Sequence, residues 1–278
     1  MISSMNIDEL VKIMAALRGE KGCPWDKEQT RESLKPFIIE EAYEVLDAVD
    51  ENDPSAVKEE LGDLLFQIVF QCRIAEEKGE FGLGDVIDGI AKKMISRHPH
   101  VFGDSDIRTS EEVLVKWDEH KKKEGKQLES ILEGVPITMP ALLRARKLQD
   151  RTAKVGFDWE RIDDVLAKLD EEVAEFKLAV RGKKKAAIED ELGDILFMIV
   201  NISRFIGVNP EEALRKTISK FISRFRYIEM AAKDKGKKLS DMSLAEMDAL
   251  WDEAKNRPDG AADSRRSSNG AAKHQQRP

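Results

Sequence analysis

One acidic motif occurs twice in this sequence, and the repeat limits which folds the chain can adopt. Each copy joins a Glu-Glu-x-x-Glu run to a Glu-Leu-Gly-Asp run, and the second glutamate lies 19 residues before the glutamate of the second run in both copies. Residues three apart in a helix project from one face. Two such helices packed antiparallel would therefore direct the carboxylates of one copy to one place. The acidic residues are Glu40, Glu41, Glu44, Glu60 and Asp63 in the first copy, and Glu171, Glu172, Glu175, Glu191 and Asp194 in the second.

The chemistry of such a cluster indicates a metal site. Carboxylates a few ångströms apart repel each other unless a cation holds them together. A site made only of oxygen ligands suits a hard cation, so we expect Mg²⁺ first and Mn²⁺ next. Gly62 and Gly193 lie inside the two predicted helices, where a glycine costs about 1 kcal/mol relative to alanine. We therefore expect another helix or a ligand to approach closely there.

The repeat extends beyond the acidic residues and indicates a duplicated domain. The segment 60–73, ELGDLLFQIVFQCR, aligns without a gap with 191–204, ELGDILFMIVNISR. Apolar residues recur with the 3.6-residue period of a helix in both halves, and no alternating run is long enough for a strand. We expect an all-α protein of two homologous helical-bundle domains packed around acidic metal sites. The expected parts are a first domain at 1–126, a linker at 127–140, a second domain at 141–257 and a disordered tail at 258–278.

Several local signals predict helix ends and packing positions. Asp53 and Asn209 each precede a proline and are expected to cap the start of a helix. Pro99 is expected to mark a helix end. Trp25 and Trp159 precede the first acidic helix of each half, and we expect them to pack against the core.

Basic pairs follow the acidic motif in both halves. Lys93 and Arg97 are four residues apart, and Lys220 and Arg224 have the same spacing. Each pair therefore lies on one helix face. Lysine and arginine neutralise phosphate oxygens beside a metal ion, so the order of acidic and basic groups predicts a polyphosphate ligand.

The two halves differ at one position of the acidic face. Lys168 lies four residues before Glu172, whereas Phe37 lies four residues before Glu41. A phenylalanine cannot neutralise a phosphate, so the second domain is predicted to hold the better equipped site. Trp117 and Trp251 lie near the end of each half, and either a core position or a flat wall against a nucleobase is consistent with them.

The composition excludes several other classes of protein. The net charge of −8 gives no indication of a nucleic-acid backbone as partner. No apolar run approaches the roughly 20 residues of a membrane span, and the N-terminal segment has no signal-peptide pattern. The two cysteines, Cys23 and Cys72, form no Cys-x-x-Cys motif, which argues against a zinc site or a disulfide framework. We expect a cytoplasmic protein.

The sequence resembles the MazG family of nucleoside triphosphate pyrophosphohydrolases. The resemblance rests on GCPWDKEQT (22–30), EEAYEVLDA (40–48), ELGDLLFQ (60–67), RHPHVF (97–102), VGFDWE (155–160) and ELGDILF (191–197). It implies a homodimer and metal ligation by Glu172, Glu175, Glu191 and Asp194. It also implies that Lys168, Glu171, Glu172, Lys220, Arg224 and Trp251 surround the nucleotide. A duplicate site in the first half would comprise Glu41, Glu44, Glu60, Asp63, Lys93, Arg97 and Trp117.

The predicted reaction is the hydrolysis of a nucleoside triphosphate to the monophosphate and pyrophosphate. Water would attack the α-phosphorus, and Glu171 or a ligand carboxylate would accept its proton. Two alternatives remain open at this point. One is a dUTPase-like or phosphoribosyl-ATP pyrophosphohydrolase, which uses similar acidic helices. The other is a regulatory module that binds nucleotide without turnover.

Overall fold

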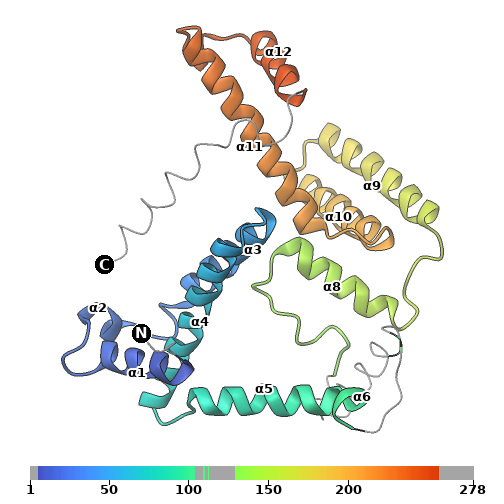
Figure 1. Ribbon diagram of the computed structural model, residues 1–278. Helices are drawn as coiled ribbons and strands as arrows, with labels where there is room; N and C mark the ends of the chain where they lie inside the picture. Colours follow the sequence, from blue (N-terminus) through green and yellow to red (C-terminus); the bar gives the residue numbers. More distant parts are fainter. Residues whose placement is uncertain (1–5, 104–108, 110–111, 113–128, 257–278) are drawn as a thin grey trace. The chain divides into compact units, whose positions relative to one another are not determined.

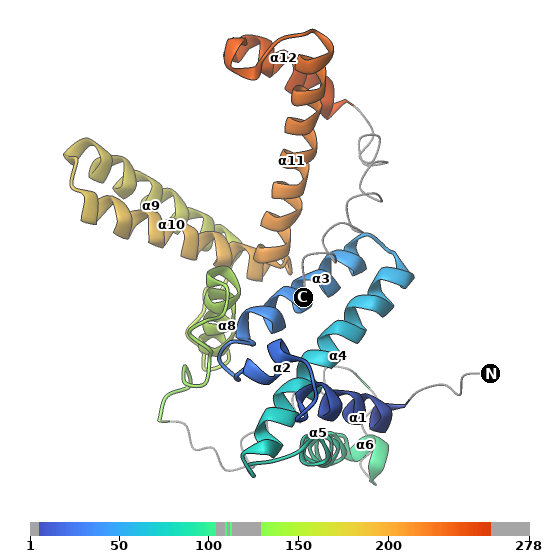
Figure 2. The ribbon, with the colours of Figure 1, turned by 90° about the vertical axis from the view of Figure 1, so that its left-hand side faces the viewer.

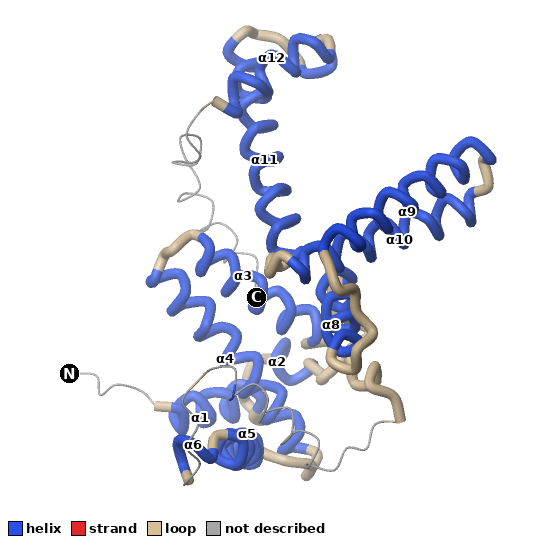
Figure 3. The backbone as a smooth tube through the Cα atoms, turned by 90° about the vertical axis from the view of Figure 1, so that its right-hand side faces the viewer, coloured by secondary structure: helices blue, strands red, loops and turns tan. Residues whose placement is uncertain are grey.

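The computed structural model describes residues 6–103, 109, 112 and 129–256. All regular structure within these residues is helical, with no strand (Figure 3), which confirms the predicted fold class. The chain divides into two compact units, Met1–Lys126 and Gln127–Arg277, referred to below as unit 1 and unit 2. The predicted tail at 258–278 lies outside the described residues, as does Trp117.

Unit 1 is built on a long helical hairpin. Its helices are α1 (Ile7–Arg18), α2 (Pro24–Glu28), α3 (Lys35–Asp50), α4 (Pro54–Glu77), α5 (Leu83–Arg97) and α6 (Pro99–Phe102). The connection between α3 and α4 is short because Asn52 adopts a left-handed conformation, with φ of 53°. Asp53 then caps α4 by accepting hydrogen bonds from the amides of Ser55 and Ala56, as predicted. The two helices consequently pack side by side (Figure 1).

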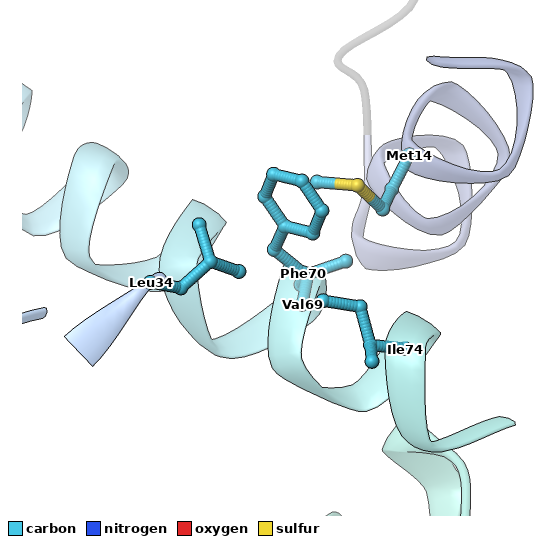
Figure 4. Packing of buried hydrophobic residues seen from close by; sticks show 5 residues of the cluster. All are labelled: Met14, Leu34, Val69, Phe70 and Ile74. Atoms are coloured by element: carbon cyan, nitrogen blue, oxygen red, sulfur yellow. The ribbon is translucent and has the colours of Figure 1, made fainter. Parts of the chain in front are cut away.

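The core of unit 1 lies at the end of this hairpin away from the connection. Met14, Leu34, Val69, Phe70 and Ile74 are almost completely buried there (Figure 4). Burying each such apolar side chain contributes about 1.5–3 kcal/mol relative to leaving it exposed. This core therefore holds α1 against α4 and fixes the residue from which α3 begins.

Unit 2 repeats the hairpin with a different set of neighbours. Its helices are α8 (Ala141–Ala153), α9 (Ile162–Gly182), α10 (Lys185–Phe205), α11 (Pro210–Asp234) and α12 (Leu244–Lys255), with a short 3₁₀ helix at Leu239–Asp241. Lys183 makes the tight left-handed connection between α9 and α10, with φ of 55°. Asn209 caps α11 by accepting from the amides of Glu211 and Glu212, as predicted.

The start of unit 2 and its distal helices are held by different contacts. Arg151 of α8 donates to the carbonyls of Ile131 and Glu133, and Val135 is buried. The segment expected as a linker is therefore bonded to α8 where it is described. A separate core of Ile228, Ala232, Met242 and Leu250 joins α12 to the distal part of α11. No described helix is both long enough and apolar enough to cross a membrane.

Candidate active site

Three carboxylates converge between α9 and α10 of unit 2. Glu172 and Glu175 come from α9 and Glu191 from α10, and one oxygen of each lies within 4.8 Å of the others. Glu172 is buried, Glu191 is partly buried and Glu175 is exposed. The hairpin brings them together because residues 172 and 175 lie on the face of α9 that meets the start of α10. The predicted convergence of these three acids is therefore present in the structure.

The electrostatics of this cluster fit a divalent cation. Burial raises the pKa of Glu191, and the negative charges of Glu175, Glu172, Asp194 and Asp190 raise it further. A carboxylate in such a position is costly to ionise without a compensating positive charge. Three carboxylate oxygens at this separation are the donor set that hard divalent cations prefer. The residues present thus fit a bound metal ion.

Lys168 connects the cluster to the neighbouring surface of α9. Its ammonium lies 2.8 Å from Glu172 and 2.9 Å from Glu171. These hydrogen bonds to Glu172 and Glu171 raise the pKa of Lys168, so the side chain stays protonated. A fixed positive charge therefore lies directly beside the carboxylate cluster.

Asp194 is the predicted ligand that the structure leaves outside the group. It is exposed and is not one of the three acids that converge. Its charge nevertheless acts on Glu191, one turn earlier in α10, by raising the pKa of that carboxyl group. Ligation by Asp194 remains a prediction.

Unit 1 holds a second carboxylate group at the equivalent place. Glu41 of α3 converges with Glu60 and Asp63 of α4, again with one oxygen of each within 4.8 Å of the others. Glu41 is completely buried. Glu44 is not a member of this group, so the two units use different three-residue subsets of the same motif.

The surroundings of the unit 1 cluster differ from those in unit 2. Phe37, at the position of Lys168, packs against the hydrophobic core and meets Trp25 edge-on with 5.8 Å between ring centroids. The packing role expected for Trp25 is confirmed. Arg97 is buried at the end of α5, two residues before Pro99, so the predicted helix end is confirmed, and Pro99 then starts α6. Lys93 is exposed.

Arg224 and Trp251 form a separate group in unit 2, and Lys220 lies one turn before Arg224 on α11. The guanidinium of Arg224 lies over the Trp251 ring, 5.6 Å from its centroid, and Phe221 packs on the same ring at 5.3 Å. The helix α11 leaves the far end of α10 and runs away from the α9–α10 hairpin (Figures 1 and 2). Lys220 lies about 15 Å along α11, at 1.5 Å per residue.

Glu191 lies near the opposite end of α10 from this exit point. It precedes the last residue of α10, Phe205, by about 21 Å along the helix axis. A single chain therefore does not bring the group on α11 and α12 to the carboxylate cluster. The sequence showed that these residues recur in order, but it did not show the direction in which α11 leaves the hairpin.

Sequence reasoning missed a hollow at the start of α9. Trp159, for which packing was expected, is 40% exposed, so that prediction is wrong. The indole lines an open hollow of about 500 Å³. The signal that could have indicated this is the acidic, polar sequence around the tryptophan. The hollow is lined by Asp158, Trp159, Glu160, Asp164, Ala167, Lys168 and Glu171.

The fold and its two carboxylate clusters define an all-α protein with a duplicated candidate metal site. The model of the MazG nucleotide pyrophosphohydrolase domain matches residues 29–102 and 161–228, one segment in each unit. With two matched segments and the relatives described next, the chain belongs to the MazG family. The resemblance inferred from the motifs is thereby confirmed.

Relatives match along most of the chain. The nucleoside triphosphate pyrophosphohydrolase/pyrophosphatase MazG of Thermotoga maritima is 44% identical over 249 residues, which cover 89% of this chain and 95% of the relative. The nucleoside triphosphate pyrophosphohydrolase of Escherichia coli K12 is 43% identical over 254 residues, or 90% and 97% of the two chains. An uncharacterised Bacillus subtilis protein, YabN, is 50% identical over 245 residues, which cover 87% of this chain but 50% of the relative.

Proposed function

We propose that this protein hydrolyses nucleoside triphosphates to nucleoside monophosphates and pyrophosphate, and that unit 2 carries most of the activity. The observation that carries the proposal is the convergence of Glu172, Glu175 and Glu191 beside the ammonium of Lys168. Two relatives of nearly the full length are named as nucleoside triphosphate pyrophosphohydrolases. Such substrates are cytoplasmic metabolites, and we place the enzyme in that compartment.

Glu172, Glu175 and Glu191 would hold the metal ion, with Asp194 as a further ligand. Mg²⁺ is the first choice and Mn²⁺ the second, since every donor is an oxygen. When bound, such a cation neutralises phosphate oxygens and lowers the pKa of water. The buried Glu172 and the partly buried Glu191 fix the site, and the exposed Glu175 keeps one side of it open to substrate.

Lys168 and Glu171 have separate roles in this proposal. The ammonium of Lys168 neutralises a phosphate oxygen and also orients the carboxylates of Glu171 and Glu172 through its two hydrogen bonds. Glu171 lies beside the carboxylate group without belonging to it. It therefore accepts the proton of the water that attacks the α-phosphorus. The bond between the α- and β-phosphates breaks, and pyrophosphate leaves.

Lys220, Arg224 and Trp251 enter the site from a second copy of the chain. A single chain separates them from the carboxylates, whereas a triphosphate needs several cations around it. The hairpin also exposes large apolar side chains on both helices, including Leu178 at 63%, Leu192 at 46% and Leu196 at 47%. Extended exposed apolar surface is typical of an interface. We therefore propose a homodimer.

Product analysis tests the function directly. Purified protein is incubated with Mg²⁺ and a panel of ordinary, deoxy and modified nucleoside triphosphates, and the products are separated by ion exchange. We expect pyrophosphate and the monophosphate in equal amounts, and no product after the metal is chelated. Release of inorganic phosphate together with the nucleoside diphosphate would contradict attack at the α-phosphorus.

The same panel separates the alternative functions. Turnover confined to dUTP would indicate a dUTPase-like enzyme, and turnover confined to phosphoribosyl-ATP would indicate the corresponding pyrophosphohydrolase. Binding without any turnover would indicate a nucleotide-binding regulatory module. The carboxylates of Glu171 and Glu172 beside Lys168 favour the enzyme over the binding module. Hydrolysis needs a group that accepts a proton from water, whereas binding a triphosphate does not.

A further inference from the structure

We propose that the hollow at the start of α9 binds the nucleoside part of the substrate and that the Trp159 indole contacts its base. The proposal rests on the function proposed above and assigns a specificity-determining residue to the same site. Trp159, Lys168 and Glu171 all line this hollow. Its volume of about 500 Å³ falls within the usual range for small-molecule sites.

The hollow adjoins the place where the phosphates would bind. Lys168 forms part of its wall, and the same ammonium lies 2.8 Å from Glu172 of the carboxylate cluster. A ligand whose phosphates contact Lys168 and the cluster can therefore extend directly into the hollow.

The charges in the hollow favour an uncharged group with hydrogen-bond donors. Glu160, Asp164 and Glu171 supply carboxylates, and Lys168 is the cation among the residues that line it. A second anion would be repelled here, whereas ribose hydroxyls and the amino groups of bases can donate to carboxylates. The phosphates therefore lie toward the cluster and the nucleoside toward Trp159.

The loop that carries Trp159 is fixed in place before any ligand binds. Asp158 accepts a hydrogen bond from Arg204 of α10 at 2.9 Å and another from the Trp159 backbone amide at 2.8 Å. Arg204 is in turn bonded to Asn201. A tryptophan whose backbone is already anchored has less freedom to lose when a base stacks on its ring. Stacking on an aromatic ring is available to every base.

A comparison with unit 1 supports a ligand role for this tryptophan. Trp25 also precedes the acidic hairpin, but it packs into a core with Phe37. Where unit 2 has Lys168 in place of Phe37, the preceding tryptophan is 40% exposed. The exposed indole and the phosphate-binding lysine thus occur in the same unit.

Equilibrium binding tests this inference independently of turnover. Titration calorimetry with Mg²⁺ would compare Trp159→Leu, Trp159→Phe and wild type. One probe is a nucleoside triphosphate with a methylene group between its α- and β-phosphorus atoms, which the proposed attack cannot cleave. The other is inorganic tripolyphosphate. The control is Phe157→Leu, in the same loop but 80% exposed and not among the residues lining the hollow.

We expect Trp159→Leu to bind the nucleotide analogue about 10-fold more weakly and tripolyphosphate within twofold of wild type. Trp159→Phe should keep most of the affinity because it retains a flat ring, and the control should match wild type. Equal losses for both probes, or no loss for the nucleotide, would overturn the proposal. If wild type releases no pyrophosphate but the selective loss is observed, the proposed function fails and this inference stands.

Discussion

In unit 2 the buried carboxylate of Glu172 lies beside the ammonium of Lys168, whereas in unit 1 the equivalent position before the buried Glu41 is occupied by Phe37. Both units preserve three converging acids from the same motif. The difference lies in the helical turn that precedes the buried glutamate, where one unit has Phe37 and the other has Lys168. In unit 1 it extends the hydrophobic core, and in unit 2 it supplies a charge and the wall of a hollow. A duplicated helical hairpin can therefore retain its acidic face while the surroundings of that face change between the two copies.

The largest expected effect tests this division of work. Glu172→Gln should lower the rate of pyrophosphate release at least about 100-fold, which is the scale of losing one key electrostatic group. Glu41→Gln, the matched change in unit 1, should leave more than about half of the activity. Both rates are measured under the same Mg²⁺ concentration on the intact chain. Equal losses would show that both sites turn over, and a larger loss from Glu41→Gln would reverse the assignment.

Lys168 provides the next comparison. Lys168→Met removes a charge-assisted contact worth about 1.5–3 kcal/mol in typical cases, so kcat/KM should fall roughly 10- to 100-fold. Lys177→Met on the exposed surface of the same helix is the control and should have little effect. Phe37→Leu should lower the stability of unit 1 and leave catalysis almost unchanged. Steady-state kinetics and thermal melts distinguish these outcomes, and a normal kcat/KM for Lys168→Met would exclude its proposed role.

A third prediction concerns the charge repulsion in unit 2 without metal. The pKa of Glu191 is raised in the folded state. At pH values between its usual pKa and the raised one, the folded protein therefore binds more protons than the unfolded chain. Stability of the metal-free protein should therefore decrease as pH rises through that interval. Glu191→Gln should remove this decrease and raise the melting temperature in the absence of metal.

Adding Mg²⁺ gives a second test of the same carboxylates. A ligand at ten times its Kd stabilises a protein by about 1.4 kcal/mol, so wild type should melt at a higher temperature with Mg²⁺ and Glu191→Gln should respond less. Glu189→Gln, exposed on α10, is the control. Calorimetry from pH 4 to pH 8 measures both effects. Identical pH profiles for wild type and Glu191→Gln would show that these carboxylates do not interact as described.

The sequence predicted the hairpins well because their determinants are local. The spacing from Glu172 to Glu191 fits two antiparallel helices with a short connection, and Asp53 and Asn209 cap helices as their proline neighbours indicated. The same pattern could not decide which three acids of each motif converge. Residues three apart differ by about 60° around a helix, so the rotation set by the core selects Asp63 in unit 1 and Glu175 in unit 2.

Longer-range features could not be predicted from these patterns. The exposure of Trp159 depends on how Arg204 fixes the preceding loop, and no periodicity in the sequence encodes that contact. The direction of α11 likewise depends on its packing against α8 and α12. This direction decides whether Lys220 and Arg224 belong to the site of their own chain or, as we propose, to that of a second copy.

The smallest expected effect tests that proposed second copy through two glycines. Gly62 and Gly193 occupy equivalent positions inside α4 and α10, and a Cβ at either position would meet nothing within 4 Å in the described structure. The described residues therefore do not make the close approach that was expected there. Alanine should then raise the free energy of unfolding by about 1 kcal/mol at each site through helix propensity alone. For Gly62→Ala we expect this full increase in the free energy of unfolding.

Gly193→Ala should raise the free energy of unfolding by less than Gly62→Ala does if the second copy or the substrate approaches α10 at this point. The same substitution should then also weaken dimerisation or raise KM, because the added methyl group would occupy the contact. Denaturant unfolding measures the stability difference, and sedimentation velocity at several protein concentrations measures the dimer. Equal gains in stability with unchanged dimerisation and unchanged KM would show that nothing approaches this face of α10. In that case Lys220, Arg224 and Trp251 would have to reach the substrate by another route, or the site would operate without them.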